Sequence, residues 1–154
     1  MFVIVDVEAT CDAGLARTIG NRNCEIIELP FLVFDVQSRA VVEERQSFVK
    51  PLHTGVTEFC TRLTGITKEK LDADGKSLQE VVTHLEDTLD RLHIADTATL
   101  LCDGRWDVFV LQKEFCEKRI TLRYPRFWRR FFDLKQEFRK HYPVEKFPDS
   151  AYHP

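Results

Sequence analysis

The chain has 154 residues, of which 44% are hydrophobic and 31% charged, and its formal net charge is −3. This length is enough for one domain with a buried core, and no apolar run approaches the ~20 residues that a membrane span requires. The N-terminus lacks the basic start and the small-residue cleavage site of a signal peptide, so we expect a cytoplasmic protein, or a nuclear one, with no membrane contact.

The five cysteines are scattered and form no C-x-x-C pair, so neither a disulfide framework nor a zinc site is predicted. We expect thiols that are buried or lie in loops. The charge is uneven: basic residues are concentrated after Lys118, whereas the part before it is acidic. A basic stretch beside an acidic site suits a polyanionic substrate and a metal centre.

The first segment is an apolar run in which two carboxylates stand two residues apart. Phe2–Val7 is β-branched and apolar enough for a buried strand, and residues at i and i+2 of a strand point to the same face. Asp6 and Glu8 would therefore repel each other unless a cation lay between them. Oxygen ligands of this kind favour Mg²⁺ or Mn²⁺. The alternative is that the pair is simply the polar end of a strand entering a loop.

An antiparallel meander is predicted next. A loop is expected over Ala9–Asn23, which is rich in loop-forming residues. Two strands are predicted over Glu25–Val36 and Val41–Val49, with a turn between them at Asp35–Arg39. Together with the first strand they form the meander, which Pro51 ends.

One helical turn over Thr57–Arg62 and a tight loop over Leu63–Thr67 are expected after the meander. The glycine in that loop permits close backbone approach. Ser77 and Glu80 form an S-x-x-E capping box at the start of the clearest helix, whose apolar residues recur at helical spacing. We interpret that stripe as core packing.

A short buried strand, Thr97–Cys102, runs into a helix that begins within Asp103–Asp107. We interpret Asp103 as the helix cap. Asp107 then lies in the first turn of the helix, just past a strand end. It is either a functional carboxylate or an acid that complements the helix dipole.

Basic and aromatic residues are interleaved from Tyr124 to Lys140, with a strand predicted over Phe131–Leu134 and a helix over Lys135–Tyr142. Such interleaving suits nucleic-acid backbones and stacked bases, and we assign Arg129 and Arg130 to the RNA backbone. The alternative is an amphipathic segment with core aromatics and solvated arginines. Beyond Pro143 we expect a tail to which no helix or strand is assigned.

Four segments in this order resemble the DEDDh exonuclease family, and most closely its Eri-type branch of histone-mRNA and small-RNA 3′-to-5′ exoribonucleases. They are Val5–Cys11, Glu25–Pro30, Phe59–Thr67 and Cys102–Asp107. The resemblance implies an α/β, RNase H-like fold: a mixed sheet, with an antiparallel meander and a parallel strand, flanked by helices.

The resemblance also implies the site and its chemistry. Asp6 and Glu8 match the first acidic motif and Asp107 the second, and these acids would hold two Mg²⁺ or Mn²⁺ ions ~4 Å apart that hydrolyse phosphodiester bonds. The substrate would be the 3′ end of single-stranded RNA. The positions that resemble those contacting the terminal nucleotide are Ala9, Thr10, Phe59, Leu63, Thr64, Gly65 and Trp106.

The family's third motif, a histidine followed five residues later by an aspartate, has no match in residues 1–154. We therefore expect a single but incomplete exonuclease domain, either truncated or degenerate, with an apolar face left uncovered that a homodimer could bury. Two functions stay open: a metal-dependent 3′-to-5′ exoribonuclease, or a catalytically deficient module that binds nucleic acid or protein. A small acidic structural protein is a weaker third.

Overall fold

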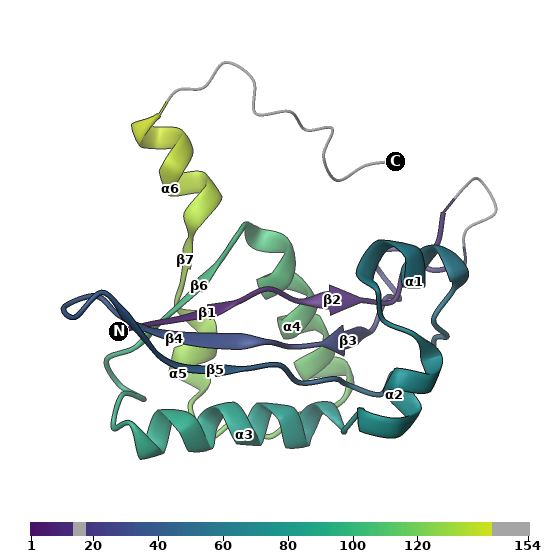
Figure 1. Ribbon diagram of the computed structural model, residues 1–154, viewed down its shortest axis with the longest axis horizontal. Helices are drawn as coiled ribbons and strands as arrows, with labels where there is room; N and C mark the ends of the chain where they lie inside the picture. Colours follow the sequence, from purple (N-terminus) through teal and green to yellow (C-terminus); the bar gives the residue numbers. More distant parts are fainter. Residues whose placement is uncertain (14–17, 143–154) are drawn as a thin grey trace.

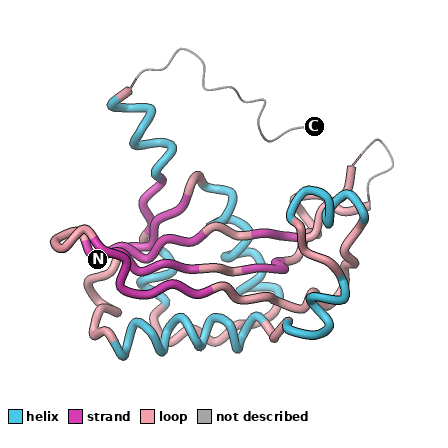
Figure 2. Tube along the Cα trace, viewed as in Figure 1, coloured by secondary structure: helices cyan, strands magenta, loops and turns pink. Residues whose placement is uncertain are grey.

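The computed structural model describes residues 1–13 and 18–142, so the tail predicted beyond Pro143 lies outside the described residues. Its centre is a mixed sheet in the order β5-β4-β1-β6-β7 (Figures 1 and 2). The strands are β1 (Phe2–Val5), β4 (Phe31–Asp35), β5 (Ala40–Arg45), β6 (Thr99–Cys102) and β7 (Phe131–Asp133). The predicted meander is confirmed, because β4 pairs antiparallel with both β1 and β5, while β6 pairs parallel with β1 and β7.

Two predicted strands are interrupted. The first ends at Val5 rather than Val7, and Glu8–Ala9 forms a separate strand, β2, that pairs with β3 (Ile26–Glu28). The run predicted as Glu25–Val36 breaks at Leu29–Pro30, where proline has no N–H to donate. The small β2–β3 sheet therefore extends beyond the end of β1 (Figure 1).

The helices are α1 (Glu58–Thr64), α2 (Lys68–Asp74), α3 (Leu78–Arg91), α4 (Arg105–Glu117), α5 (Pro125–Arg129) and α6 (Leu134–His141). The capping box of Ser77 and Glu80 is confirmed. The prediction of a loop from Leu63 was wrong: α1 continues to Thr64, and Gly65 ends it at φ 75°, a left-handed conformation that favours glycine. Neither α2 nor α5 was predicted. Within the described residues no helix is both long and apolar enough to cross a membrane.

One face of the sheet carries the main core. Helices α3, α4 and α5 bury their apolar residues against Val3, Val33 and Leu100, all of which have no exposed surface. The buried carboxylate of Glu86 on α3 holds α5 in place: it accepts hydrogen bonds from the backbone of Arg123 and Tyr124 and from the indole of Trp128. These donors satisfy a carboxylate that would be costly to bury alone.

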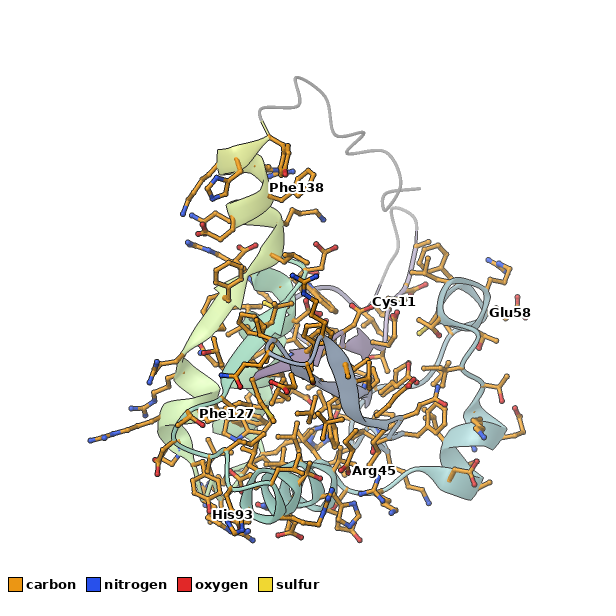
Figure 3. The ribbon with its side chains drawn as sticks, turned by 60° about the vertical axis from the view of Figure 1, so that its left-hand side comes forward. Cys11, Arg45, Glu58, His93, Phe127 and Phe138 are labelled. Atoms are coloured by element: carbon orange, nitrogen blue, oxygen red, sulfur yellow. The ribbon has the colours of Figure 1, made fainter. Side chains whose placement is uncertain are left out.

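The opposite face is only partly covered. Phe2 lies opposite Phe34 and Ile4 opposite Leu32 in the β1–β4 register, and all four side chains are half-buried. On β7, which lies beyond β6 in the sheet, the ring of Phe132 is 6.1 Å from the ring of Phe2. Helix α6 projects away from the sheet and has no buried residue; Phe138 stands out on it in Figure 3, whereas Phe127 lies within the body.

A buried charge network fixes α4 to Glu25, the first residue of the Glu25–Pro30 segment. Glu25 accepts hydrogen bonds from the backbone of Leu52, His53 and Thr54 at 2.6–2.8 Å. Lys118 lies 3.0 Å from both Glu25 and Glu114. Burial alone would raise the pKa of Glu25, but these donors outweigh it and lower the pKa to about 2.

We expect Glu25→Gln to destabilise the protein at neutral pH and much less in acid. A carboxylate whose folded pKa lies below its unfolded value of 4.5 stabilises the fold above that value and loses the contribution as pH falls toward 2. The lost stability at pH 7 should reach up to ~3 kcal/mol. Urea unfolding of wild type and variant between pH 7 and pH 3 measures the difference.

Glu58→Gln is the control, because Glu58 is fully exposed beside Arg62 and should leave the unfolding profile close to that of wild type. A Glu25→Gln deficit of the same size at pH 7 and pH 3 would contradict a charge-based role for Glu25.

Candidate active site

The two acidic motifs are joined by a hydrogen bond. Asp6 and Val7 occupy the break between β1 and β2, and the Val7 N–H donates to Oδ1 of Asp107 at 3.1 Å. Asp107 is 5% exposed and lies in the first turn of α4, the helix that follows β6. Because β1 and β6 are parallel neighbours, their carboxyl ends meet at one edge of the sheet. Residues 100 positions apart thus form one site.

Two of the acids at this edge have raised pKa values, and neighbouring carboxylates contribute to both. Burial, and then the charges of Asp6, Glu28 and Asp107, raise the pKa of Glu8 to about 7. Burial likewise raises the pKa of Asp107 to about 6; the Val7 N–H opposes the rise, and the charge of Asp6 adds to it. Glu8 and Asp107 therefore each favour either a proton or a nearby cation.

A fourth carboxylate, Glu28, lies beside this trio, and sequence reasoning gave it no role. It is opposite Glu8 in the β2–β3 register, is 8% exposed, and accepts a hydrogen bond from Gln46 Nε2 at 2.5 Å. Like charges directly opposite each other in a sheet are destabilising. The available signal was an acid at the end of the buried run Glu25-Ile-Ile-Glu28.

The donor set fits a hard divalent ion, because Asp6, Glu8 and Asp107 offer carboxylate oxygens only. In residues 1–13 and 18–142, however, no three His, Cys, Asp or Glu side chains are grouped closely enough to hold a metal as they stand. Burial and neighbouring negative charge raise the pKa of Glu8 and of Asp107, and a bound cation would relieve both effects.

Helix α1 is fastened to the segment that follows Glu8. The Thr57 hydroxyl donates to the Cys11 carbonyl at 2.7 Å, and the Cys60 thiol contacts the Ala9 carbonyl at 3.6 Å; Figure 3 shows Cys11 close to this helix. Phe59 and Leu63 are one turn apart on α1, and Leu63 is 56% exposed. An apolar pair therefore stands near the acidic motif.

Two other predicted contacts with the terminal nucleotide, Thr64 and Gly65, line a cavity of about 340 Å³. Its wall also contains Glu28, Phe48 and Lys70, so the end of α1 and the acid opposite Glu8 share one hollow. Trp106, 40% exposed, precedes Asp107 on α4.

Thr10 is fully buried, and its side chain is occupied by the scaffold. Its hydroxyl accepts from the Glu25 N–H at 2.9 Å and lies 2.8 Å from that of Thr54. Ala9 is also buried. The structure thus gives Thr10 a positioning role, and contact of Ala9 and Thr10 with a substrate stays a prediction.

The structure does not bring Arg129 and Arg130 to the acids. Both are exposed at the end of α5, at the amino end of β7, whereas the acids follow the carboxyl ends of β1 and β6. The interpretation of Asp103 as a helix cap was wrong: Gly104 occupies the N-cap position of α4, without a side-chain cap. Asp103 instead lies 3.6 Å from Lys135.

Comparison with known proteins matches this arrangement to one family. A family model described as Exonuclease (RNase_T) matches residues 3–149. The chain is 29% identical over 147 residues to 3′-5′ exoribonuclease 1 of Homo sapiens, which covers 93% of this chain and 40% of that protein. It is 32% identical over 136 residues to 3′-5′ exonuclease eri1 of Schizosaccharomyces pombe, covering 73% of this chain and 45% of the relative.

Comparison with solved structures gives the same family. The nuclease domain of 3′hExo, a DEDDh family member bound to rAMP, superposes with a TM-score of 0.80 at 26% identity, over 93% of this chain and 70% of that one. The predicted RNase H-like exonuclease fold and the predicted family are both confirmed. The match also runs through both acidic motifs that the Val7–Asp107 hydrogen bond joins. The chain therefore belongs to the RNase_T exonuclease family, in which it resembles the Eri-type DEDDh enzymes.

Proposed function

We propose that this chain supplies the metal-binding part of a 3′-to-5′ exoribonuclease acting on single-stranded RNA. The observation that carries the proposal is the hydrogen bond from Val7 to Asp107, which gathers Asp6, Glu8 and Asp107 at one sheet edge. The chain spans less than half the length of the curated relatives named above, so its activity and its substrate are proposals.

The proposed mechanism assigns the metal to the carboxylates. Asp6, Glu8 and Asp107 would hold Mg²⁺ or Mn²⁺, and two bound ions supply an activated water and stabilisation of the leaving 3′ oxygen. The hydrogen bond from the buried Val7 N–H holds Asp107 beside the segment that carries Asp6 and Glu8. Because the carboxylates must lose their protons to bind a cation, the raised pKa of Glu8 makes the site proton-sensitive.

RNA is the proposed substrate because a relative that covers 93% of this chain is named 3′-5′ exoribonuclease 1, and a similar structure is bound to rAMP. On this chain, Phe59, Leu63 and Trp106 would hold the terminal base by apolar contact. The backbone of Thr64 and Gly65 would lie against its sugar.

We expect Mn²⁺ to raise the melting temperature of the protein. Binding to the folded state alone stabilises by about 2.7 kcal/mol at a hundredfold excess over the dissociation constant. The gain should be larger at pH 8 than at pH 6, because the proton held by Glu8 with a pKa of about 7 competes with the ion. Thermal unfolding with Mn²⁺ or with EDTA measures the difference.

Asp6→Asn should abolish this gain. Asp103→Asn, which removes an acid from the same edge but outside the trio, should retain it. A melting temperature that ignores Mn²⁺, or an Asp6→Asn variant that responds as wild type does, would show that the trio is not a metal site.

We expect the 154-residue chain to trim RNA slowly, because the histidine and aspartate of the third motif have no match in it. Grafting the segment of a relative that carries both should speed cleavage ~10²- to 10⁴-fold, the usual contribution of a positioned general base. A time course on 5′-labelled single-stranded RNA with a free 3′ hydroxyl tests this, with Asp107→Asn made in each protein. Fast trimming by the ungrafted chain would contradict the expectation, and a grafted protein that binds RNA without cleaving it would favour a pure binding module.

We further propose that a second copy of the chain covers the partly exposed sheet face, since Phe132 is 36% exposed there and contacts Phe2. Sedimentation should give a dimer for wild type and a monomer for Phe132→Asp. Leu52→Asp is the matched control, because Leu52 is 66% exposed and lies in a loop outside the sheet. A monomeric wild type at high concentration would overturn this proposal.

A further inference from the structure

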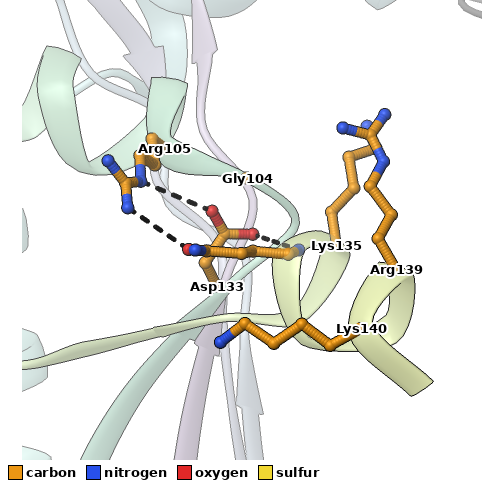
Figure 4. A pocket seen from close by; sticks show the side chains of 7 residues that line it. Gly104, Arg105, Asp133, Lys135, Arg139 and Lys140 are labelled. Carbon is orange, nitrogen blue, oxygen red and sulfur yellow. Dashed lines mark hydrogen bonds and ion pairs between the residues drawn. The ribbon is translucent and has the colours of Figure 1, made fainter.

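A basic cavity of about 660 Å³ lies between the start of α4 and helix α6 (Figure 4). Its lining residues are Gly104, Arg105, Asp133, Lys135, Gln136, Arg139 and Lys140. β6 and β7 are parallel neighbours, and the lining residues follow their carboxyl ends. Since β1 is parallel to β6 as well, the cavity opens at the same sheet edge as the acidic trio.

The charge of the cavity is strongly positive: four of the lining side chains are cationic and one is anionic. That one acid, Asp133, is largely occupied, because its side chain is 11% exposed, caps α6 by accepting the Gln136 N–H at 2.8 Å, and lies 3.8 Å from Arg105 Nε. Lys140 pairs with Glu137 at 2.5 Å, but Arg105 and Lys140 keep 73% and 55% of their side-chain surface exposed. The cavity therefore presents cations to solvent.

The start of α4 adds backbone donors to this wall. Gly104 is its N-cap and gives no side-chain cap, so the first N–H groups of a 13-residue helix lack the usual side-chain acceptor. Gly104 has φ 118°, and a Cβ built on it would meet nothing within 4 Å. The approach to these donors is open, and a helix start with uncapped amides attracts anions.

Aromatic side chains flank the cations. Trp106, next to Arg105, is 40% exposed, and Phe138, between the cations of α6, is also 40% exposed. Exposed aromatics among cations suit a single-stranded nucleic acid, whose bases stack while its phosphates contact the cations. A folded protein partner with an acidic surface would use the cations without needing the aromatics.

We infer that this cavity binds the phosphodiester backbone of single-stranded RNA upstream of the 3′-terminal nucleotide, with Arg105, Lys135, Arg139 and Lys140 as the phosphate contacts. The inference rests on the proposed function, since it takes the 3′ end to lie at the acidic trio. Trp106 directly joins the two regions: it follows Arg105 of the cavity and precedes Asp107 of the site. The strand would leave the site past α4 and continue along α6.

The test compares two double variants that remove the same charge at opposite ends of β7. Arg139→Gln with Lys140→Gln removes two cations of the cavity, and Arg129→Gln with Arg130→Gln removes two exposed cations at the other end. Affinity for a 12-nucleotide single-stranded RNA is measured by fluorescence anisotropy in EDTA, which prevents cleavage, over a series of salt concentrations.

The cavity variant should bind about tenfold more weakly, and its slope of log affinity against log salt should be shallower by about 1.4, or 0.7 for each lost phosphate contact. The charge-preserving exchange Arg139→Lys with Lys140→Arg should restore binding. Circular dichroism of each variant establishes that α6 is retained. A greater loss in the Arg129/Arg130 variant, or equal losses in both, would overturn the inference.

Binding of AMP with Mn²⁺ separates this inference from the proposed function, because a mononucleotide supplies the terminal nucleotide without an upstream backbone. If the cavity variant binds AMP as wild type does but binds long RNA weakly, both proposals stand. If long RNA is unaffected while AMP still binds, the cavity proposal fails and the nuclease site survives. If wild type binds no AMP, the proposed function fails.

Discussion

The site depends on the hydrogen bond between the Val7 N–H and Asp107. The backbone leaves the main sheet after Val5 and enters the small β2–β3 sheet at Glu8, so Val7 has no strand partner of its own. A buried N–H must find an acceptor, and the carboxylate of Asp107 supplies it from a helix 100 residues away. The same bond holds Val7, and with it the adjoining Asp6 and Glu8, to the segment that carries Asp107.

This arrangement works against stability in the metal-free protein. Burial and the charges of neighbouring carboxylates raise the pKa of both Glu8 and Asp107, so the fold holds these groups in a less favourable state than water does. The network of Glu25, Lys118 and Glu114 links α4 to β3, because Glu114 Oε2 accepts a hydrogen bond from the Ile26 N–H at the start of β3. A network of opposite charges thus supports a repulsive one, as expected where function sets the charges.

Local patterns predicted the parts of the fold that local physics determines. The strands of the meander and the capping box of Ser77 and Glu80 follow from alternation and capping chemistry, and they are present. The helix α5 was missed because its five residues are held by tertiary contacts, chiefly Trp128 against Glu86. Asp103 was misassigned because the unusual backbone of Gly104, not side-chain chemistry, starts α4.

Motif order identified Asp6, Glu8 and Asp107, but it could not show which other charges share their edge. Glu28 enters the site through the β2–β3 register. The basic cavity exists because β6 and β7 are parallel neighbours, although 28 residues lie between the end of β6 at Cys102 and the start of β7 at Phe131. No short-range pattern links residues 104–105 with residues 133–140. Pairing of strands distant in sequence decides both features.

That shared edge sets a physical order on the proposed binding events. A phosphodiester strand and the acids at Asp6, Glu8 and Asp107 carry the same sign, so the strand is repelled from the trio until cations neutralise it. The cavity cations are fixed to the protein and act without a metal, whereas the trio becomes attractive only after protons are replaced by divalent ions. The upstream backbone can therefore bind first and hold the 3′ end near a site that the metal then completes.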